Sequence, residues 1–175
     1  KTLVDTLTPS DNLATLFAQN SNEGRTNIHS YFNTKINERN LVRIGSMSSF
    51  IQYNYADSIF QFALKDYYIQ RNDQGTTNLS QGYVNFQHKF SKRTKAVAGL
   101  HGTYFALSED YTVEPRLSIS HDLSSSTSIN IAYGKHSQSA PINVYLVRPE
   151  TADGSELPSA NKSLKLLKSH HLVAG

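Results

Sequence analysis

The sequence of 175 residues contains no cysteine, no tryptophan and a single methionine, Met47. Without cysteine the chain has no disulfides and no cysteine-ligated metal, and thiol catalysis is excluded. This absence suits a protein of the bacterial envelope and a cytosolic protein equally well. Cysteine usage therefore does not decide the compartment.

Long hydrophobic runs are also missing. The longest uncharged stretch, Ile44 to Ala56, is short and rich in Ser, Gln, Asn and Tyr, which excludes a transmembrane helix. The N-terminus has no apolar segment typical of a signal peptide, and the sequence opens at Lys1 rather than at methionine. We therefore expect the chain to be a fragment, with any signal peptide outside it.

Clusters of one charge sign are small. The net charge is +3, from Lys and Arg scattered singly apart from groups such as Lys89 to Lys95. Nucleic-acid binding requires a continuous basic stripe, so no nucleic-acid partner is expected. With 38% hydrophobic residues and a mean hydropathy of −0.46, the chain also has little apolar material for a closed core.

What the sequence does contain, from Thr26 onward, is a two-residue alternation of apolar and polar residues in long segments separated by polar turns. This period predicts an all-β protein. In Tyr111 to Leu123 the apolar residues occupy odd positions and the polar residues even ones, and Thr127 to Gln138 repeats the split. Segments of this length exceed the five or six residues usual in globular sheets and suit a tilted membrane crossing.

Three hairpins follow from the alternation. Keeping the apolar faces together across Ser124 to Ser126 predicts these pairs: Leu123 with Thr127, Ile119 with Ile131, Leu117 with Tyr133 and Glu114 with His136. A second hairpin joins 79–91 to 95–107 through Lys92 to Thr94, which predicts Phe90 beside Ala96, Phe86 beside Leu100 and Gly82 beside Tyr104. The third joins 26–36 to 41–55 through 37–40.

At the ends of the hairpins away from these three turns, the sequence predicts longer connections between the strands. Ser58 to Asn78 and Ala140 to Lys165 are read as long loops, and only Ser108 to Asp110 as a short turn. Short turns at one end and long loops at the other are typical of outer-membrane barrels. Before the strands, Ser10 to Gln19 is predicted to form a short helix. Six tyrosines are interpreted either as a headgroup-level aromatic girdle or simply as strand-forming residues, and the girdle is favoured for the last two: Tyr53, Tyr55, Tyr67, Tyr68, Tyr104 and Tyr111.

Three stretches carry a family resemblance: GTTNLSQGYVNFQHKFSKRTKAVAGLHGTYFAL (75–107), EPRLSISHDLSSSTSINIAYGKHSQSAP (114–141) and ANKSLKLLKSHHLVAG (160–175). They resemble the barrel of TonB-dependent outer-membrane receptors of Bacteroidetes-type bacteria. The resemblance implies a transporter in the outer membrane of a Gram-negative bacterium, which takes up an unidentified ligand with energy relayed by an inner-membrane complex through a plug domain. The plug and further strands would lie outside this chain, so the fragment alone is expected to be inactive.

Candidate chemistry is sparse. The sequence contains no catalytic set and no cofactor motif. It also contains no pair with metal-ligand spacing, because the adjacent His170 and His171 must point to opposite sides of a strand. The predicted register instead gathers four polar side chains on one face: Glu114, Arg116, His136 and Gln138. They would either touch ligand or plug, or form a hydrogen-bond network inside a polar barrel lumen.

The sequence thus predicts an all-β antiparallel meander of long hairpins, an incomplete segment of a transmembrane β-barrel with about six to seven strands over residues 1–175. Outer-membrane lipid is the expected surrounding, and the isolated fragment is expected to self-associate through its open edges. The alternative is a soluble β-sandwich binding module for carbohydrate or adhesion, in which the same apolar faces would pack on each other.

Overall fold

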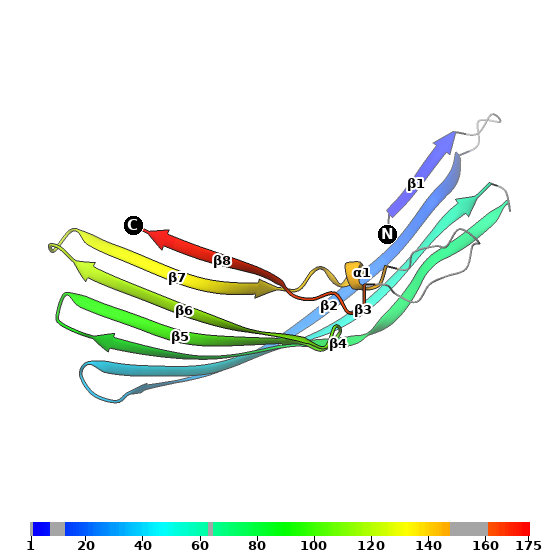
Figure 1. The fold of residues 1–175 in the computed structure, drawn as a ribbon. Coiled ribbons are helices and arrows are strands. Elements are labelled where there is room, and N and C mark those ends of the chain that lie inside the picture. The colour runs from blue at the N-terminus through cyan, green and yellow to red at the C-terminus, as the bar shows by residue number, and fades with distance from the viewer. Residues whose placement is uncertain (1, 8–12, 63–64, 148–160) are drawn as a thin grey trace. The chain divides into compact units, whose positions relative to one another are not determined.

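The computed structural model describes residues 2–7, 13–62, 65–147 and 161–175. These residues form one short helix and eight strands, rather than the six or seven predicted: β1 (Thr2–Leu7), β2 (Leu13–Lys35), β3 (Asn40–Gln61), β4 (Asp66–Lys89), β5 (Thr94–Phe105), β6 (Asp110–Asp122), β7 (Ser128–Gln138), α1 (Ile142–Tyr145) and β8 (Leu167–Ala174). The strands neighbour one another in chain order (Figure 1). The predicted all-β antiparallel meander of long hairpins is confirmed.

The chain divides into two compact units. Unit 1 comprises residues 1–26, 50–77 and 141–164, and unit 2 comprises residues 27–49, 78–140 and 165–175. The helix α1 belongs to unit 1, whereas β5, β6, β7 and β8 lie in unit 2. No helix among the described residues is long and apolar enough to cross a membrane.

The hairpin of β6 and β7 has the register that the apolar faces predict. Leu117 is opposite Tyr133, Ile119 is opposite Ile131, and the backbone of Leu123 bonds to that of Thr127 across the serine turn. The register is fixed because a slip of one residue would exchange the apolar and polar faces.

The predicted register of β4 and β5 is wrong by two residues. Phe86 is opposite Ala98 rather than Leu100, and Gly82 is opposite Gly102 rather than Tyr104. The turn explains the shift, because the Ser91 hydroxyl accepts hydrogen bonds from the backbone amides of residues 93 and 94 and so closes the loop one residue earlier. Alternation alone could not detect this, since a shift of two residues leaves every side chain on its face.

The hairpin of β2 and β3 also follows the prediction. Asn37 shapes its turn, because the side-chain oxygen accepts the backbone amides of Arg39 and Asn40, each at 2.9 Å. The long loop expected from Ser58 to Asn78 is not found, since β3 continues to Gln61 and β4 begins at Asp66.

Two other predictions at the strand ends differ from the structure. Residues 13–19 belong to β2 and not to a helix, because pairing with β1 satisfies their backbone in the sheet. Of the long loop expected from Ala140 to Lys165, the structure describes residues 140–147, which include α1, and residues 161–165, whereas the rest of this loop lies outside the described residues. The predicted asymmetry between short turns and long loops is therefore limited to this one connection.

In unit 1, a cationic side chain ties α1 to the sheet. Arg71 on β4 pairs with Asp57 on β3, lies 5.0 Å from the ring centroid of Tyr55, and donates at 3.4 Å to the carbonyl of Asn143 in α1. Tyr55 is buried and donates to Glu23, so it cannot belong to an exposed girdle as predicted.

In unit 2, the two faces of the sheet differ in burial. Along β6 the even-numbered Thr112 and Glu114 are buried, whereas the odd-numbered residues, including Leu117 and Ile119, are exposed. The same alternation places exposed Tyr104 directly opposite exposed Tyr111, as a girdle would require. The face with Glu114 is called the polar face below, and the opposite one the apolar face.

The corrected register of β4 and β5 can be tested with cysteine pairs, because the natural sequence has none. The double variant F86C/A98C is expected to form a disulfide on mild oxidation, since directly opposite residues lie within its reach. The variant F86C/L100C pairs a residue with a diagonal neighbour and is expected to crosslink poorly. Non-reducing electrophoresis measures both, and preferential crosslinking of the second pair would restore the register predicted from the sequence.

Candidate functional site

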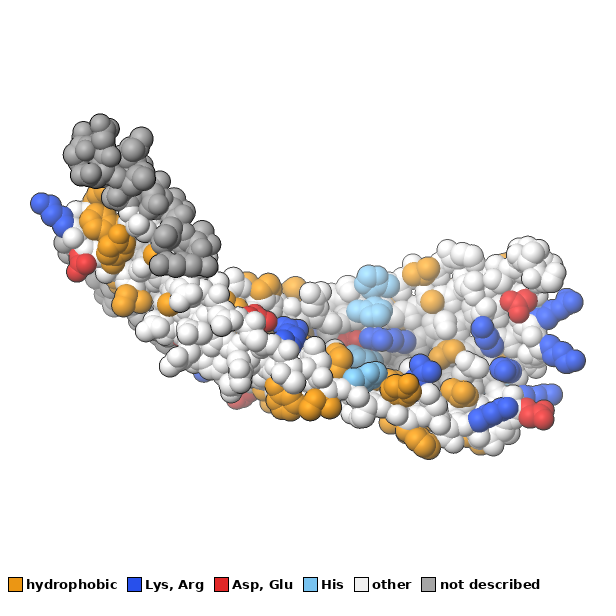
Figure 2. Space-filling model, turned by 180° about the vertical axis from the view of Figure 1, so that it is seen from behind, with side chains coloured by type: hydrophobic (Ala, Val, Ile, Leu, Met, Phe, Trp, Pro, Cys, Tyr) orange, Lys and Arg blue, Asp and Glu red, His pale blue; other side chains and the backbone are white. Residues whose placement is uncertain are grey.

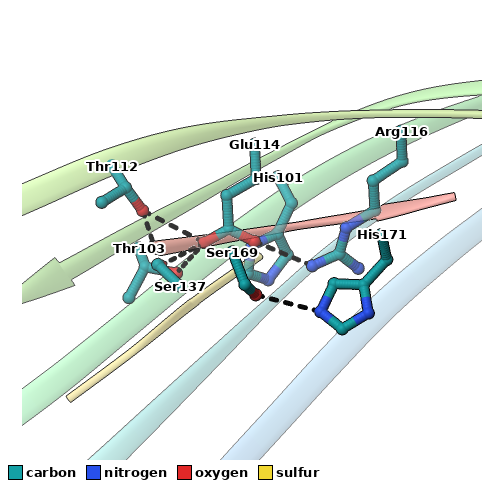
Figure 3. A network of polar contacts seen from close by, with 8 residues as sticks. All are labelled: His101, Thr103, Thr112, Glu114, Arg116, Ser137, Ser169 and His171. Carbon is teal, nitrogen blue, oxygen red and sulfur yellow. Dashed lines mark hydrogen bonds and ion pairs between the residues drawn. The ribbon is translucent and has the colours of Figure 1, made fainter. Parts of the chain in front are cut away.

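The polar face of unit 2 is centred on a carboxylate. Glu114 on β6 is 1% exposed, and its Oε1 accepts hydrogen bonds from the hydroxyls of Thr112 at 3.1 Å and Thr103 at 3.2 Å (Figure 3). The Ser137 hydroxyl on β7 donates to the same oxygen. Hydroxyl groups of three adjacent strands thus converge on one atom, which holds β5, β6 and β7 together at this level.

The second carboxylate oxygen of Glu114, Oε2, lies close to nitrogen atoms of Arg116 and His101. Arg116 Nη2 donates to Oε2 at 2.9 Å, and His101 Nδ1 lies 3.1 Å from it. The contact with His101 is close but lacks hydrogen-bond geometry, so Nδ1 has no hydrogen-bond partner among the described residues. A buried carboxylate needs such compensation, because burying an unpaired charge costs several kcal/mol.

On one side of the carboxylate an aromatic row continues across the polar face. The ring of His101 stacks on that of Tyr83, with centroids 6.4 Å apart, and the Tyr83 hydroxyl lies 3.4 Å from His29 Nε2. Tyr83 reaches from β4 to β2 over Gly45 of β3, where an added Cβ would lie 2.5 Å from the ring. Glycine is therefore required at position 45 for this row to form.

On the other side lie two more histidines. The rings of His136 on β7 and His171 on β8 meet edge to face with centroids 5.0 Å apart. Figure 3 shows the hydrogen bond between Ser169 and His171, which is 3.0 Å long. Gly134 leaves the room for His136, because a Cβ there would lie 2.8 Å from the imidazole nitrogen. Figure 2 shows histidine side chains gathered beside cationic ones on this face of the molecule.

Arg116 stands between two open cavities. One of about 280 Å³ is lined by His29, Arg43, Tyr83 and His101 among others, and one of about 340 Å³ by Asn85, His136 and His171 among others. Arg116 lines both and is 40% exposed on its side chain. Its guanidinium keeps donors for a further acceptor, and the neighbouring imidazoles can donate or accept. The arrangement can therefore bind a polar or anionic group, although it can equally serve only to satisfy Glu114.

Three of the four predicted site residues come together. Glu114, Arg116 and His136 lie on the polar face, whereas Gln138 is exposed and stands opposite Leu167 of β8. The predicted pair of Glu114 with His136 is not formed, because the ladder of β6 and β7 ends at Arg116 and Gly134. Beyond Gly134 the alternation of β7 is irregular. The hydroxyl of Ser137, the residue after His136, bonds to Glu114 instead.

Sequence reasoning missed the residues that β5 supplies. His101 is opposite Glu114, and Thr103 is opposite Thr112. The short turn expected at 108–110 makes β5 the neighbour of β6, but it predicts the wrong pairing, because a loop of these residues would place Glu114 opposite Tyr104. In the structure the turn covers residues 106–109, which brings His101 opposite Glu114. The contributions of His29 and Tyr83 could not be foreseen, since they depend on the space above Gly45.

The expectation for the adjacent histidines is confirmed. His170 Nδ1 lies 2.8 Å from the hydroxyl of Tyr133 on the apolar face, whereas the ring of His171 contacts that of His136 on the polar face. The two histidines therefore point to opposite faces of β8. Among the described residues, no three of the side chains His, Cys, Asp or Glu are grouped so that they could hold a metal ion.

Truncating the central carboxylate tests the network. Glu114→Ala is expected to lower the free energy of unfolding by roughly 2–3 kcal/mol, because it leaves Arg116 and buried hydroxyls without their acceptor. Glu114→Gln keeps the shape and should cost less. Urea unfolding of the chain in detergent micelles measures the change, with exposed Glu38→Ala as the control, expected within about 0.5 kcal/mol of wild type. Equal effects of Glu114→Ala and Glu38→Ala would show that the network contributes nothing.

Comparison with known proteins gives no relative from which a role for this site could be transferred. No protein-family model, no curated protein and no solved structure matches the chain.

Proposed function

We propose that the chain is part of the barrel of an outer-membrane receptor for energy-coupled uptake of a ligand in a Gram-negative bacterium, and that it has no catalytic activity of its own. The observation that carries this proposal is the distribution of side chains over the two faces of unit 2. The buried residues of unit 2 include the polar Ser49, Thr103, Thr112 and Glu114, with Phe105 and Leu166 as apolar exceptions, whereas the large apolar residues of the opposite face are exposed. Such an inside-out arrangement is what a lipid-surrounded barrel with a polar lumen requires.

The apolar face is extensive. Exposed apolar side chains on β4 to β8 include Val84, Phe86, Leu100, Val113, Leu117, Ile119, Ile129, Ile131 and Leu172. Fully burying one such side chain is worth roughly 1.5–3 kcal/mol, so a face of this size needs a cover. Lipid supplies that cover without a second protein layer. The alternative, a soluble β-sandwich, would require a second sheet, and the described residues form only one.

The strand lengths agree with a bilayer. β5, β6 and β7 have 12, 13 and 11 residues, which at about 3.3 Å per residue gives roughly 36–43 Å along each strand. Inclined by about 45°, strands of this length rise roughly 25–30 Å, close to the hydrocarbon thickness of a membrane. The polar face with Glu114 would then line the lumen.

In this setting, Arg116 and His136 are the candidate contacts for the imported ligand or for a plug domain. Arg116 borders both cavities, and His136 borders one of them. Coupling to an inner-membrane energising complex would act through the plug region, as the family resemblance implies. Neither a cofactor nor nucleic acid has a role in this proposal.

Single cysteines carrying an environment-sensitive fluorophore test the membrane assignment. The adjacent variants I119C and S118C place the probe on the apolar and the polar face, respectively. In vesicles of zwitterionic lipid, the probe at 119 is expected to be quenched strongly by brominated lipid, and the probe at 118 weakly, because alternate residues face opposite sides.

The same two variants separate the alternatives. Equal quenching at both positions would contradict a lipid-facing apolar side. An apolar environment at 119 that is already complete in aqueous buffer, and insensitive to brominated lipid, would favour the β-sandwich.

Self-association of the isolated chain is a second expectation. Every residue of β8 is exposed, and Leu172 and Val173 are 78% and 60% exposed. An open apolar edge pairs readily with another copy. Light scattering in detergent-free buffer should therefore report oligomers, and detergent should dissociate them. A compact monomer in buffer alone would contradict the proposal.

A further inference from the structure

One cavity on the polar face of unit 2 is lined by two arginines. The cavity of about 280 Å³ lies over strands β2 to β6, and its lining includes Arg43 of β3 and Arg116 of β6. The other residues that line it are His29, Met47, Gln81, Tyr83, Asn85 and His101. None of these residues carries a carboxylate, so the surface of the cavity is positively charged. It is called the arginine cavity below.

The strand registers place the arginine cavity on the polar face. His101 is opposite Glu114, and Tyr83 is opposite His101. The ring of Tyr83 lies over Gly45, and Arg43 is two residues from Gly45 on the same strand. Residues two apart on a strand share a face, so Arg43 projects to the same side as Tyr83. The arginine cavity therefore faces the lumen of the proposed barrel and not the lipid.

Arg43 is held in place but has no counterion. Its Nε donates to Asn33 Oδ1 at 2.7 Å, and its guanidinium lies 5.8 Å from the ring centroid of Tyr31. Among the described residues, Arg43 forms no ion pair, and its terminal nitrogens have no hydrogen-bond acceptor. These nitrogens can donate in parallel to two oxygen atoms of one bound group.

Arg116 contributes to the arginine cavity from β6. Its Nη2 donates to Glu114 Oε2 at 2.9 Å, which fixes the guanidinium (Figure 3). A guanidinium has five N–H donors, so this bond leaves others for a further acceptor. Glu114 offsets the charge of Arg116, and the charge of Arg43 remains uncompensated. An anion in the cavity would supply the missing negative charge.

Uncharged groups complete the lining. Two imidazoles and two amides can donate N–H groups to the cavity: His29, His101, Gln81 and Asn85. The Tyr83 hydroxyl lies 3.4 Å from His29 Nε2, and the Tyr83 ring stacks on that of His101, so both imidazoles are held in position. Donors thus surround the cavity from five strands. An oxyanion accepts hydrogen bonds at each of its oxygens and fits such a lining, whereas a cation would find no carboxylate there.

We propose that the arginine cavity binds an oxyanion, the phosphate or carboxylate group of a small imported ligand. Arg43 and Arg116 would donate to its oxygens from the two sides. The planar fork of a guanidinium matches the paired oxygens of both groups. Because other side chains already hold both arginines, binding costs little side-chain freedom. The anion site follows from the cavity itself, whereas the identification of the anion as an imported ligand rests on the proposed function.

Calorimetric titration of the chain in neutral detergent tests the proposal. Sodium phosphate and sodium acetate are the probes, and chloride keeps the ionic strength constant. Wild type should bind at least one of them at a single saturable site. Arg43→Gln should weaken that binding roughly 10-fold or more, because charge-assisted hydrogen bonds are lost while the network around Glu114 stays intact. Absence of saturable binding to wild type would overturn the proposal.

A matched variant separates the arginine cavity from net charge. Arg39→Gln removes the same charge at the turn between β2 and β3, outside the cavity. It should change the affinity less than about 2-fold, because salt screens distant charges. Equal losses in Arg43→Gln and Arg39→Gln would overturn the proposal in favour of general electrostatic attraction.

Chemical modification gives an independent readout on the wild-type chain. Phenylglyoxal modifies accessible guanidinium groups, and mass spectrometry locates the products. The bound anion should protect Arg43 and Arg116 but leave Arg39 and Arg93 reactive, because the latter two lie outside the arginine cavity. Equal protection of all four, or protection of none, would overturn the proposal.

The probes also distinguish the sources of the oxyanion. Tighter binding of phosphate than of acetate would assign a phosphorylated ligand, and the reverse order a carboxylic acid. Tighter binding of an oligoglutamate peptide than of either small anion would indicate a polypeptide segment and overturn the ligand assignment. Anion binding without the expected lipid quenching of I119C and S118C would reject the membrane function but not the cavity. Normal quenching without anion binding would reject only the arginine cavity.

Discussion

Successive residues of a β-strand point to opposite faces, and the arrangement of unit 2 depends on this one geometric constraint. It separates the apolar side chains of β4 to β8 from the polar ones without help from a second layer. It also brings Glu114 and Arg116, two residues apart on β6, to the same face. The carboxylate is thereby surrounded by groups from both neighbouring strands, and its charge is compensated although the side chain is 1% exposed.

The polar network and the apolar face are two results of the same pattern. A slip of β7 by one residue along β6 would turn Ile131 and Tyr133 toward the polar groups and would place Asn130 and Ala132 on the apolar face, so both faces would fail together. Glycine makes the polar face possible at two points. Gly45 and Gly134 leave room for the rings of Tyr83 and His136, which are too large to lie over a neighbouring Cβ.

The strand order, the serine-turn register and the common face of Glu114, Arg116 and His136 could be predicted, because each depends on alternation that is visible in the sequence. The register of β4 and β5 could not, since it depends on which hydroxyl closes the turn, and Ser91 and Thr94 are both available. The helix expected at 10–19 shows the limit of local patterns. Spacing in a short segment suggested a helix, whereas pairing with β1 determines a strand.

The backbone bonds between neighbouring turns have a further consequence. Lys89, which bonds to the first turn, precedes the second turn, and Asp122, which bonds to the second turn, precedes the third. Each hairpin therefore extends beyond the one before it, always in the same direction. Such a stagger is the shear of a sheet, and shear together with strand number sets the tilt and diameter at which a sheet can close. Further strands added with the same stagger would inherit that tilt, whatever their side chains recognise.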